Sequence, residues 1–396
     1  MSDAKPKVLV AMSGGVDSSV AAALLVRAGY EVVGVFMRLG SPGETLDELM
    51  PADEACDAGA VRIGKQGCCS INDAADAREV AAQLGVPFYV CNFKKDFGRI
   101  IDYFVDEYAA GRTPNPCVRC NDWLKFGKLH DYAQQIGADF VASGHYARVA
   151  DGPEGPRLLR GIDHGKDQSY VLFGVPRDHM TRMLLPVGGY TKPEIRALAR
   201  EMDLPVFDKP DSQEICFVPD NDYAGLVERK RPELARSGRI VDEHGNELGA
   251  HAGQHRFTVG QRRGIGVALG HPVYVIEKEP ETGNVRIGTR DRLMTGAASA
   301  GEANWLADPA AIDGRAVLAQ YRYNAPAARA RVRIGPDAGD ATPSGRTGTF
   351  DVEFDEPQEA VAPGQALVLY DPSAPDAVLG GGWITAAHRI EAGVGR

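Results

Sequence analysis

The N-terminal stretch Val8-Leu9-Val10-Ala11-Met12-Ser13-Gly14-Gly15-Val16-Asp17-Ser18-Ser19 sets the organisation of the chain. Val8–Met12 is apolar and uncharged, which is typical of a buried parallel strand. Val20–Val26 is rich in helix-forming residues, and Gly29 ends it. The two glycines between these runs permit a tight turn and let backbone N–H groups approach an anion at the positive end of the helix dipole. The sequence therefore predicts a strand, a phosphate-binding loop and a helix.

This loop is not of the Walker type, because the spacing G-x-x-x-x-G-K-[ST] is absent and no lysine follows the glycines. Asp17 lies inside the loop, where a carboxylate repels phosphate unless a divalent cation lies between them. The sequence thus predicts Mg²⁺ bound together with pyrophosphate. The pattern of Ser13–Ser18 is similar to the signature of the ATP pyrophosphatases, which cleave ATP between the α and β phosphates and adenylate a substrate. An ordinary strand–turn–helix connection is the alternative.

Length and composition indicate a globular protein of two or three domains, since the chain has 396 residues, of which 44% are hydrophobic and 25% charged. No apolar run reaches the length of a membrane span, and the N-terminus lacks the apolar core of a signal peptide, so we expect a cytoplasmic protein. The net charge of -10 means that nucleic acid must be bound by local basic patches. Seven cysteines in such a chain indicate reactive thiols or metal binding more than a disulfide framework.

Strands and helices alternate through the first half of the chain, which predicts an α/β fold with a doubly wound parallel sheet. Ligands bind such sheets at the carboxyl ends of the strands, where Ser13–Ser19, Met37 and Gly144-His145 all fall. The predicted strands are Val8–Met12, Glu31–Met37, Phe88–Asn92 and Asp139–Ser143, and the predicted helices include Ala74–Leu84, Lys95–Ala110, Leu124–Ile136 and Lys192–Met202. From Ile240 onward, short β-rich runs between turn residues predict a small antiparallel barrel or sandwich.

An irregular stretch from Gly40 to Gly67 interrupts this alternation and is interpreted as an inserted surface loop, because it is rich in proline, glycine and charge. In or beside it lie Cys56, Cys68 and Cys69, interpreted as surface thiols, with a zinc site as the alternative. Three further cysteines, Cys117, Cys120 and Cys216, lie in two polar, turn-rich segments. Such surroundings favour reactive thiols over buried small hydrophobic residues, and Arg119 beside the first pair favours a thiolate.

Six motifs occur in order along the chain, and together they resemble the bacterial tRNA-specific 2-thiouridylase family over nearly the whole length. They are Ser13–Ser18, Thr113–Pro116 followed by Cys120-Asn121, Gly144–Tyr146, Lys166–Tyr170, Ser212–Phe217 and Thr258–Gly264. The resemblance implies ATP-dependent 2-thiolation of the wobble uridine in tRNAs for Lys, Glu and Gln. It implies an ATP-pyrophosphatase domain over residues 1–218, a central tRNA-contacting domain over 219–292 and a β-barrel over 293–396. An amide-forming ATP pyrophosphatase and a non-catalytic tRNA-binding or sulfur-carrier protein are the alternatives.

In the reaction that the resemblance implies, ATP adenylates the C2 oxygen of uracil, and a cysteine persulfide supplies the sulfur. Cys216 is the residue implied to carry the persulfide. Cys120 is implied to attack it, or to attack the activated base, which leaves a Cys120–Cys216 disulfide for later reduction. The implied partners are tRNA and a sulfur donor, either a cysteine desulfurase or a sulfur-relay protein, with no membrane.

Cys117 departs from the family pattern Asn-Pro-Asp-x-x-Cys, because it stands where that pattern has the aspartate. A thiol is no simple replacement for a carboxylate, so the acid–base assignment stays open. The departure also creates a set of three thiols, Cys117, Cys120 and Cys216, as candidate ligands of a [4Fe–4S] cluster that binds exogenous sulfur. A redox pair or zinc also fits the C-x-x-C spacing.

The remaining site residues follow from their positions in the resemblance. ATP contacts are implied at Ala11, Met12, Ser13, Gly14, Gly15, Val16, Asp17, Ser18, Met37 and Gly144. Contacts with tRNA or the target base are implied at Asn115, Pro116, Cys117, His145, Lys166, Asp167, Gln168, Arg322, Tyr323 and Gln365. Met37 also fits a core methionine. Arg322 and Tyr323 offer a cation and a stacking ring for RNA, or are simply an exposed strand pair. The basic run 229–239 suits phosphate, or is a solvated face.

Overall fold

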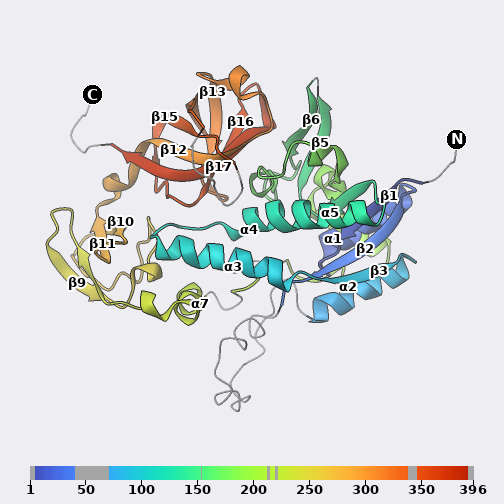
Figure 1. Cartoon of the computed structure of the whole chain (residues 1–396), viewed down its shortest axis with the longest axis horizontal. Coiled ribbons are helices and arrows are strands. Elements are labelled where there is room, and N and C mark those ends of the chain that lie inside the picture. The colour runs from blue at the N-terminus through green and yellow to red at the C-terminus, as the bar shows by residue number, and fades with distance from the viewer. Residues whose placement is uncertain are drawn as a thin grey trace, which may run out of the picture. The chain divides into compact units, whose positions relative to one another are not determined.

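The structure, a computed structural model, describes residues 5–40, 71–152, 154–211, 215–218, 222–337 and 346–390 (Figure 1). The predicted insertion lies almost entirely outside these residues, as do Cys56, Cys68 and Cys69. The chain divides into two compact units. Unit 1 comprises Met1–Ile100 and Cys117–Asp222, and unit 2 comprises Ile101–Pro116 and Tyr223–Arg396. In the described residues no helix is long and apolar enough to cross a membrane.

A five-stranded parallel sheet forms the centre of unit 1, with the strand order β3-β2-β1-β4-β7; β1, β2 and β3 are labelled in Figure 1. The strands are β1 Lys7–Ala11, β2 Glu31–Arg38, β3 Phe88–Asn92, β4 Phe140–Ser143 and β7 Met183–Leu184. The chain runs outward from β1 through β2 to β3 and then returns to β4 on the other side of β1. The strand order therefore reverses between β1 and β4, which is where doubly wound sheets bind ligands.

Helices pack against this sheet because its strands are apolar on both faces. Val8 and Val10 of β1 share one buried cluster with residues of α1 Val16–Arg27, α2 Ile71–Gln83 and α6 Lys192–Glu201. Leu9, which alternates with them, is also fully buried but lies outside this cluster, so the second face is covered too. The predicted doubly wound parallel sheet is confirmed.

The segment around the first cysteine pair is helical. The sequence predicts a turn-rich segment from Gly111 to Asn121, which is confirmed for residues 111–115 and is wrong from Pro116 onward. The helix α4 Pro116–Arg119 continues into a π-helix, η1 Cys120–Lys128, and then into α5 Leu129–Gln135. Pro116 is compatible with a helix because it occupies the first position, where no backbone N–H is needed. π-helices are rare in proteins, and those that occur are often found at functional sites.

The rest of unit 1 consists of short elements, and one helix is shared between the units. The hairpin β5 Ala147–Gly152 and β6 Gly155–Arg160 follows β4, and after it come η2 Ser169–Val171, η3 His179–Arg182 and η4 Pro186–Gly189. The helix α3 Lys94–Ala109 lies across the boundary between the units, which falls after Ile100.

Unit 2 contains a four-stranded sheet with the order β10-β11-β8-β9. Its strands are β8 Gly238–Val241, β9 Glu247–His251, β10 Tyr274–Glu279 and β11 Asn284–Gly288. They enclose a small core that includes Ile240, Phe257, Val275 and Val285. The helix α7 Tyr223–Lys230 and the short turns η5 Pro232–Leu234, η6 Gln254–Arg256 and η7 Arg290–Leu293 complete this part.

Six antiparallel strands form a closed barrel in unit 2, drawn in orange to red in Figure 1. The strands are β12 Met294–Trp305, β13 Ala316–Gln320, β14 Ala328–Ile334, β15 Phe350–Glu359, β16 Ala366–Asp371 and β17 Ala374–Arg389, and α8 Pro309–Ile312 follows β12. The order is β12-β15-β14-β13-β16-β17, and pairing of β12 with β17 closes the barrel. The predicted antiparallel barrel is confirmed, although the sequence pattern does not predict β12, which is mostly alanine, glycine and serine.

Candidate functional site

The loop between β1 and α1 wraps around the hydroxyl of Ser18. The Ser13 N–H donates to Ser18 Oγ over 3.1 Å, and this hydroxyl donates to the carbonyl oxygen of Gly15 over 3.1 Å. Gly14 has a φ of +74°, which favours glycine. Gly15 stands at the N-cap and has no side chain with which to cap the helix, so the first-turn N–H groups of α1 are suited to an anion.

The carboxyl end of β4 packs against the same loop. A Cβ on Gly144 would lie 2.6 Å from the backbone nitrogen of Ser18 and 2.7 Å from the carbonyl carbon of Asp17. Only glycine fits at this distance. The structure thus brings Gly144 to the phosphate-binding loop at the point where the strand order reverses, as the sequence predicts for a ligand site.

Lys192 supplies a cation at this loop. Its Nζ donates to Asp17 Oδ1 over 2.7 Å, and the Tyr146 hydroxyl donates to the same oxygen over 2.7 Å. Lys192 is only 8% exposed. It begins α6, where the Glu194 carboxylate accepts hydrogen bonds from the N–H and hydroxyl of Thr191. Burial and the neighbouring Asp17 raise the pKa of Tyr146, so its phenol remains a donor. No local pattern singles out Lys192 as a site residue, because the capping motif predicts a helix start but not where its ammonium lies.

Asp211 connects this lysine to the segment that leads to Cys216. Lys192 Nζ lies 2.8 Å from Asp211 Oδ1, and Lys166 Nζ lies 2.8 Å from Oδ2. Arg196 also reaches this carboxylate, at 2.9 Å. Burial acts to raise the pKa of Asp211, but the hydrogen bonds from the two lysines outweigh it and hold the pKa at about 2. Lys166, expected to contact RNA, is thus ion-paired here.

Lys209 forms a second connection between that segment and the loop. Its Nζ donates to the carbonyl oxygen of Gly14 over 3.0 Å, to Asp73 over 2.6 Å and to Asp76 over 2.5 Å. Burial acts to lower the pKa of Lys209, but hydrogen bonds to both carboxylates raise it overall. The stretch from Lys209 to Asp211 therefore contacts the phosphate-binding loop directly through Lys209 and indirectly through the pairing of Asp211 with Lys192.

Three residues expected to contact tRNA organise the turns after β4. His145 is 7% exposed, and its Nδ1 lies 2.6 Å from Ser143 Oγ. Burial, with a smaller contribution from the charge of Lys125, lowers the pKa of His145 well below its usual value. Asp167 accepts hydrogen bonds from Arg160, Gly161 and Ser169. Gln168 Oε1 accepts from the Tyr146 N–H over 2.9 Å. An RNA contact at these residues stays a prediction, as does an ATP contact at Met37, which is buried.

The cysteines differ in exposure. Cys117 is exposed on α4, whereas Cys120 and Cys216 are half-buried. Arg119 between the first two is 1% exposed, and its guanidinium carbon lies 5.0 Å from the centre of the Trp123 ring. Within the described part of the chain, which contains all three cysteines, no three His, Cys, Asp or Glu side chains could together hold a metal ion. The cysteines of a [4Fe–4S] cluster each bind a different iron, so a cluster at these three thiols stays a prediction.

Family models match the chain along almost its whole length. They are described as the tRNA methyl transferase HUP domain (residues 6–220), the tRNA methyl transferase PRC-barrel domain (227–289) and the aminomethyltransferase beta-barrel domain (296–384). The tRNA-specific 2-thiouridylase MnmA of Rhodopirellula baltica is 47% identical over 401 residues, covering 97% of each chain. That of Carboxydothermus hydrogenoformans is 46% identical, covering 96% of this chain and 98% of the relative. The chain belongs to the tRNA-specific 2-thiouridylase family.

This finding confirms the resemblance drawn from the six motifs. Among solved structures, the U34-tRNA thiolase NcsA from Methanococcus maripaludis with its [4Fe-4S] cluster matches at 15% identity and a TM-score of 0.31, covering 59% of this chain and 67% of that one. A likeness of this extent supports no conclusion about the site of this thiouridylase-family chain.

In unit 2 of this family member, the residues expected to bind RNA lie at strand ends of the barrel. Arg322 and Tyr323 are exposed after β13, and the Gln320 side-chain amide donates to both of their carbonyl oxygens, over 3.3 and 2.9 Å. The side-chain amide of Gln365 donates to Thr113 and Pro114.

Three of the five cations of the predicted basic run pair with carboxylates. Lys230 pairs with Asp102 at 3.5 Å, and Arg231 pairs with Asp106. Arg239 lies 3.4 Å from Glu247. These partners belong to unit 2, as the run itself does. This run therefore offers less positive charge to RNA than its sequence indicates.

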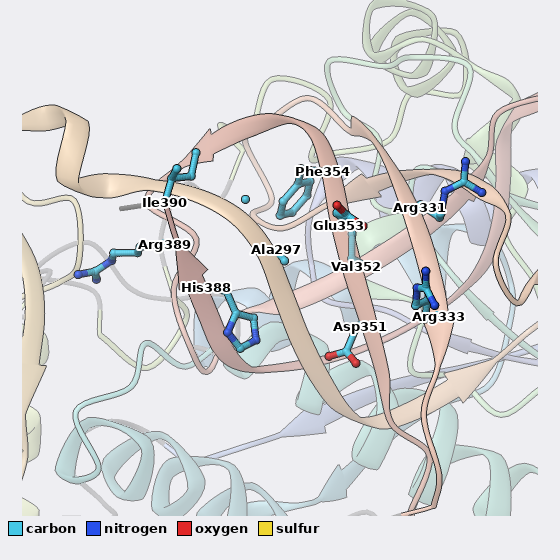
Figure 2. A pocket seen from close by; sticks show the side chains of 11 residues that line it. Ala297, Arg331, Arg333, Asp351, Val352, Glu353, Phe354, His388, Arg389 and Ile390 are labelled. Carbon is cyan, nitrogen blue, oxygen red and sulfur yellow. The ribbon is translucent and has the colours of Figure 1, made fainter. Parts of the chain in front are cut away.

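An open pocket of about 430 Å³ lies on the barrel (Figure 2). Figure 2 shows Arg331 and Arg333 on one strand and Asp351 and Glu353 on the next, with His388 opposite. In the strand register Arg331 stands across from Glu353 and Arg333 from Asp351. The charges of these residues balance, and no predicted site residue of the family resemblance lines the pocket.

Proposed function

We propose that this chain is a tRNA-uridine 2-sulfurtransferase, which thiolates C2 of the wobble uridine in tRNAs for Lys, Glu and Gln at the expense of ATP. The observation that carries the proposal is that Lys209 donates to the Gly14 carbonyl oxygen in the phosphate-binding loop, while Lys192 pairs with both Asp17 of the loop and Asp211. Lys209 and Asp211 precede Cys216 by only a few residues in the sequence, and all three belong to unit 1 with the loop. Membership of the 2-thiouridylase family supports the same reaction.

In the first step, the C2 oxygen of the uridine attacks the α-phosphorus of ATP, and pyrophosphate leaves. The N–H groups at the start of α1 and the Lys192 ammonium suit the charge that develops on this leaving group. Asp17 is the residue that would hold Mg²⁺, which neutralises pyrophosphate charge when bound. The adenylated oxygen is then a good leaving group, as AMP.

In the second step, sulfur arrives as a persulfide on Cys216, supplied by a cysteine desulfurase or a sulfur-relay protein. The Cys120 thiolate attacks Cys216 Sγ, which breaks the S–S bond of the persulfide and releases hydrosulfide. The hydrosulfide adds to C2 and displaces AMP. Two thiols are thereby oxidised to a Cys120–Cys216 disulfide while the transferred sulfur is reduced, and an external dithiol restores the thiols. Attack of the persulfide itself on C2, followed by Cys120, gives the same products.

Cys117 supplies neither sulfur nor electrons in this scheme, and no step passes through an iron–sulfur cluster. Asn115, Pro116 and Cys117 precede Cys120 and suit contacts with the flipped-out base. Arg322 and Tyr323 suit contacts with the anticodon arm through charge and stacking. A tRNA substrate makes the cytoplasm the expected compartment.

The test compares metal-free protein with Cys120→Ser, Cys216→Ser and Cys117→Ala variants, using unmodified tRNA, ATP and a persulfide donor. We expect the two serine variants to lose 2-thiouridine formation but to keep tRNA-dependent pyrophosphate release, whereas Cys117→Ala keeps both. Activity that appears only after anaerobic reconstitution with iron and sulfide, and that all three variants lose, contradicts the two-cysteine scheme. Pyrophosphate release with small amide-forming substrates and no tRNA would support the other class of ATP pyrophosphatase.

A further inference from the structure

The π-helix η1 brings Lys125 onto the same face as Cys120. At its end the Leu129 N–H donates to the Leu124 carbonyl oxygen, five residues back. Residues five apart therefore lie one turn apart on one face, as the i→i+5 bonds of a π-helix require. In an α-helix of 3.6 residues per turn, the same spacing would turn the lysine about 140° away from the thiol. The π-helix thus gives Cys120 a cation as its neighbour along the helix.

His145 holds the Lys125 ammonium at the carboxyl end of β4. Lys125 Nζ lies 3.4 Å from His145 Nε2, and His145 Nδ1 lies 2.6 Å from Ser143 Oγ. Because an ammonium can only donate hydrogen bonds, Nε2 is the acceptor and the ring proton lies on Nδ1, which donates to Ser143. The lowered pKa of His145, caused by burial and then by Lys125, keeps this ring neutral. The imidazole therefore orients the lysine without neutralising its charge.

Lys125 differs in this respect from the other lysines around the phosphate-binding loop. Lys192 and Lys209 each pair with two carboxylates. Among the residues that the structure describes, no carboxylate pairs with Lys125, whose hydrogen-bond partner is the neutral ring of His145. Lys125 is also half-buried, so water screens its charge less than that of an exposed lysine. Such a cation is suited to an anionic group of a ligand.

The neighbours of Lys125 indicate which anion this is. His145 directly follows Gly144, where a Cβ would lie 2.6 Å from the backbone nitrogen of Ser18 in the phosphate-binding loop. Lys125 therefore links the helix face that carries Cys120 to the residue beside this loop, and all of these residues belong to unit 1. In the proposed reaction, the α-phosphate stands between the pyrophosphate and the uridine. A cation between the loop and the attacking thiol thus suits the α-phosphate.

We propose that the Lys125 ammonium binds the α-phosphate of the adenylated uridine and of the AMP that leaves it, with His145 as the positioning residue for this ammonium. The inference rests on the proposed function, because it requires an adenylated intermediate. It gives His145 a role different from the RNA contact implied by the family resemblance.

The charge of Lys125 favours the second chemical step. When hydrosulfide adds to C2, its proton passes to N3 of the base, the C2–O bond breaks, and the electron pair of that bond stays on the phosphate oxygen of AMP. The α-phosphate thereby gains one negative charge in this step, whereas the first step places the new charge on pyrophosphate. Lys125 therefore stabilises the departure of AMP, as the loop and Lys192 stabilise that of pyrophosphate.

Binding of AMP and of pyrophosphate to the full-length protein tests the proposal. Lys125→Met keeps the apolar stem and removes the charge, and Lys125→Gln takes its place if urea unfolding shows that the methionine variant does not fold. We expect the Kd for AMP to weaken about 10- to 100-fold, as for a lost hydrogen bond to a charged group, and the Kd for pyrophosphate to change less than about twofold. Lys128→Met, an exposed lysine on the same helix, is the matched control and should change neither Kd.

Single-turnover kinetics separate the two steps. With tRNA, a persulfide donor and ATP labelled at the α-phosphate, Lys125→Met should accumulate labelled tRNA and release AMP about 10- to 100-fold more slowly, while pyrophosphate release stays within about twofold. His145→Leu should weaken AMP binding in the same direction, and His145→Gln, which keeps an acceptor, should restore it.

An unchanged Kd for AMP in the Lys125 variant overturns the proposal. Equal weakening for AMP and pyrophosphate also overturns it, because the lysine would then serve the ligand of the loop. Equal losses in His145→Leu and His145→Gln overturn the positioning role of His145. Binding of AMP that depends on Lys125, in a protein that thiolates no tRNA, counts against the proposed function and supports the phosphate site, because this measurement does not depend on activity.

Discussion

Lys192 is the single residue on which the charge of the phosphate-binding loop depends most. Its ammonium lies between the carboxylates of Asp17 and Asp211, 2.7 and 2.8 Å away. Lys166 and Arg196 also pair with Asp211, and Asp163 accepts a hydrogen bond from the Lys192 backbone N–H, so three cations face three carboxylates. Loss of the Lys192 ammonium would leave this group with net negative charge beside the loop, which opposes a polyphosphate there.

Replacing Lys192 with methionine should therefore impair the use of ATP. We expect kcat/KM for ATP, measured as tRNA-dependent pyrophosphate release, to fall about 10- to 100-fold, because a hydrogen bond to a charged group contributes about 1.5–3 kcal/mol. Arg200→Met on the exposed side of the same helix is the control and should change it less than about twofold, as expected for a surface substitution. An unchanged kcat/KM for ATP in Lys192→Met would show that this lysine has no role in the use of ATP.

At the level of elements, the contact between β4 and the loop leaves no room for a side chain at Gly144. Gly144→Ala should destabilise the protein by about 1–3 kcal/mol, because its Cβ meets backbone atoms that move only with the loop. ATP binding should weaken with it. Gly98→Ala is the control, since no atom lies within 4 Å of its Cβ in α3, and it should stabilise by up to about 1 kcal/mol. Urea unfolding measures the stability of each variant, and nucleotide titration measures its affinity for ATP. Equal stability of Gly144→Ala and Gly98→Ala contradicts the prediction.

The strand β10 carries a buried lysine whose charge opposes folding. Lys278 is 8% exposed, its Nζ donates to the Phe257 carbonyl oxygen over 3.1 Å, and it lies 5.6 Å from the centre of the Tyr108 ring. Burial lowers the pKa of Lys278 to about 8. Below pH 8 both the folded and the unfolded chain hold this proton, so the cost of burying the charge is present in full. Between pH 8 and 10.5 only the unfolded chain keeps it, so the free energy of unfolding rises with pH.

Lys278→Met should remove this pH dependence. The difference in unfolding free energy between the two proteins should change by on the order of 3 kcal/mol from pH 8 to pH 10.5, since each tenfold change in proton affinity corresponds to about 1.4 kcal/mol. Other groups titrate alike in both proteins and cancel in the comparison. Parallel stability curves over this range would show that Lys278 titrates near its ordinary pKa.

For the whole molecule, the net charge of -10 opposes RNA, so binding must rest on local exposed cations such as Arg322 rather than on paired ones such as Arg231. Arg322→Ala should weaken tRNA binding and reduce the slope of log Kd against log salt concentration by about one, as expected for one lost phosphate contact. Arg231→Ala should leave that slope unchanged, because Asp106 already neutralises this arginine. Equal slopes for both variants contradict an RNA contact at Arg322.

Much of the fold follows from local patterns. Local patterns include the apolar run at Val8, the helix formers after it and the alternation of later strands with helices. Each reflects burial or steric preference over a few neighbouring residues, and these preferences hold in the folded protein as well. The six motifs likewise place the phosphate-binding loop and the cysteines. Local patterns failed where tertiary context decides: β12 is a strand because β15 and β17 pair with it, and Cys117 is helical because α4 continues into η1.

The connections that make a site of these parts are not visible in any local pattern. Lys192 meets Asp17, and Gln365 meets Thr113, although each pair is separated by well over a hundred residues in the chain. The stretch 101–116 lies among the residues of the pyrophosphatase domain in sequence but belongs to unit 2 in space. An ion pair or a hydrogen bond of this kind forms only after distant segments have packed. The partners in such an interaction are determined by tertiary packing, whereas helix and strand formation is determined largely by neighbouring residues.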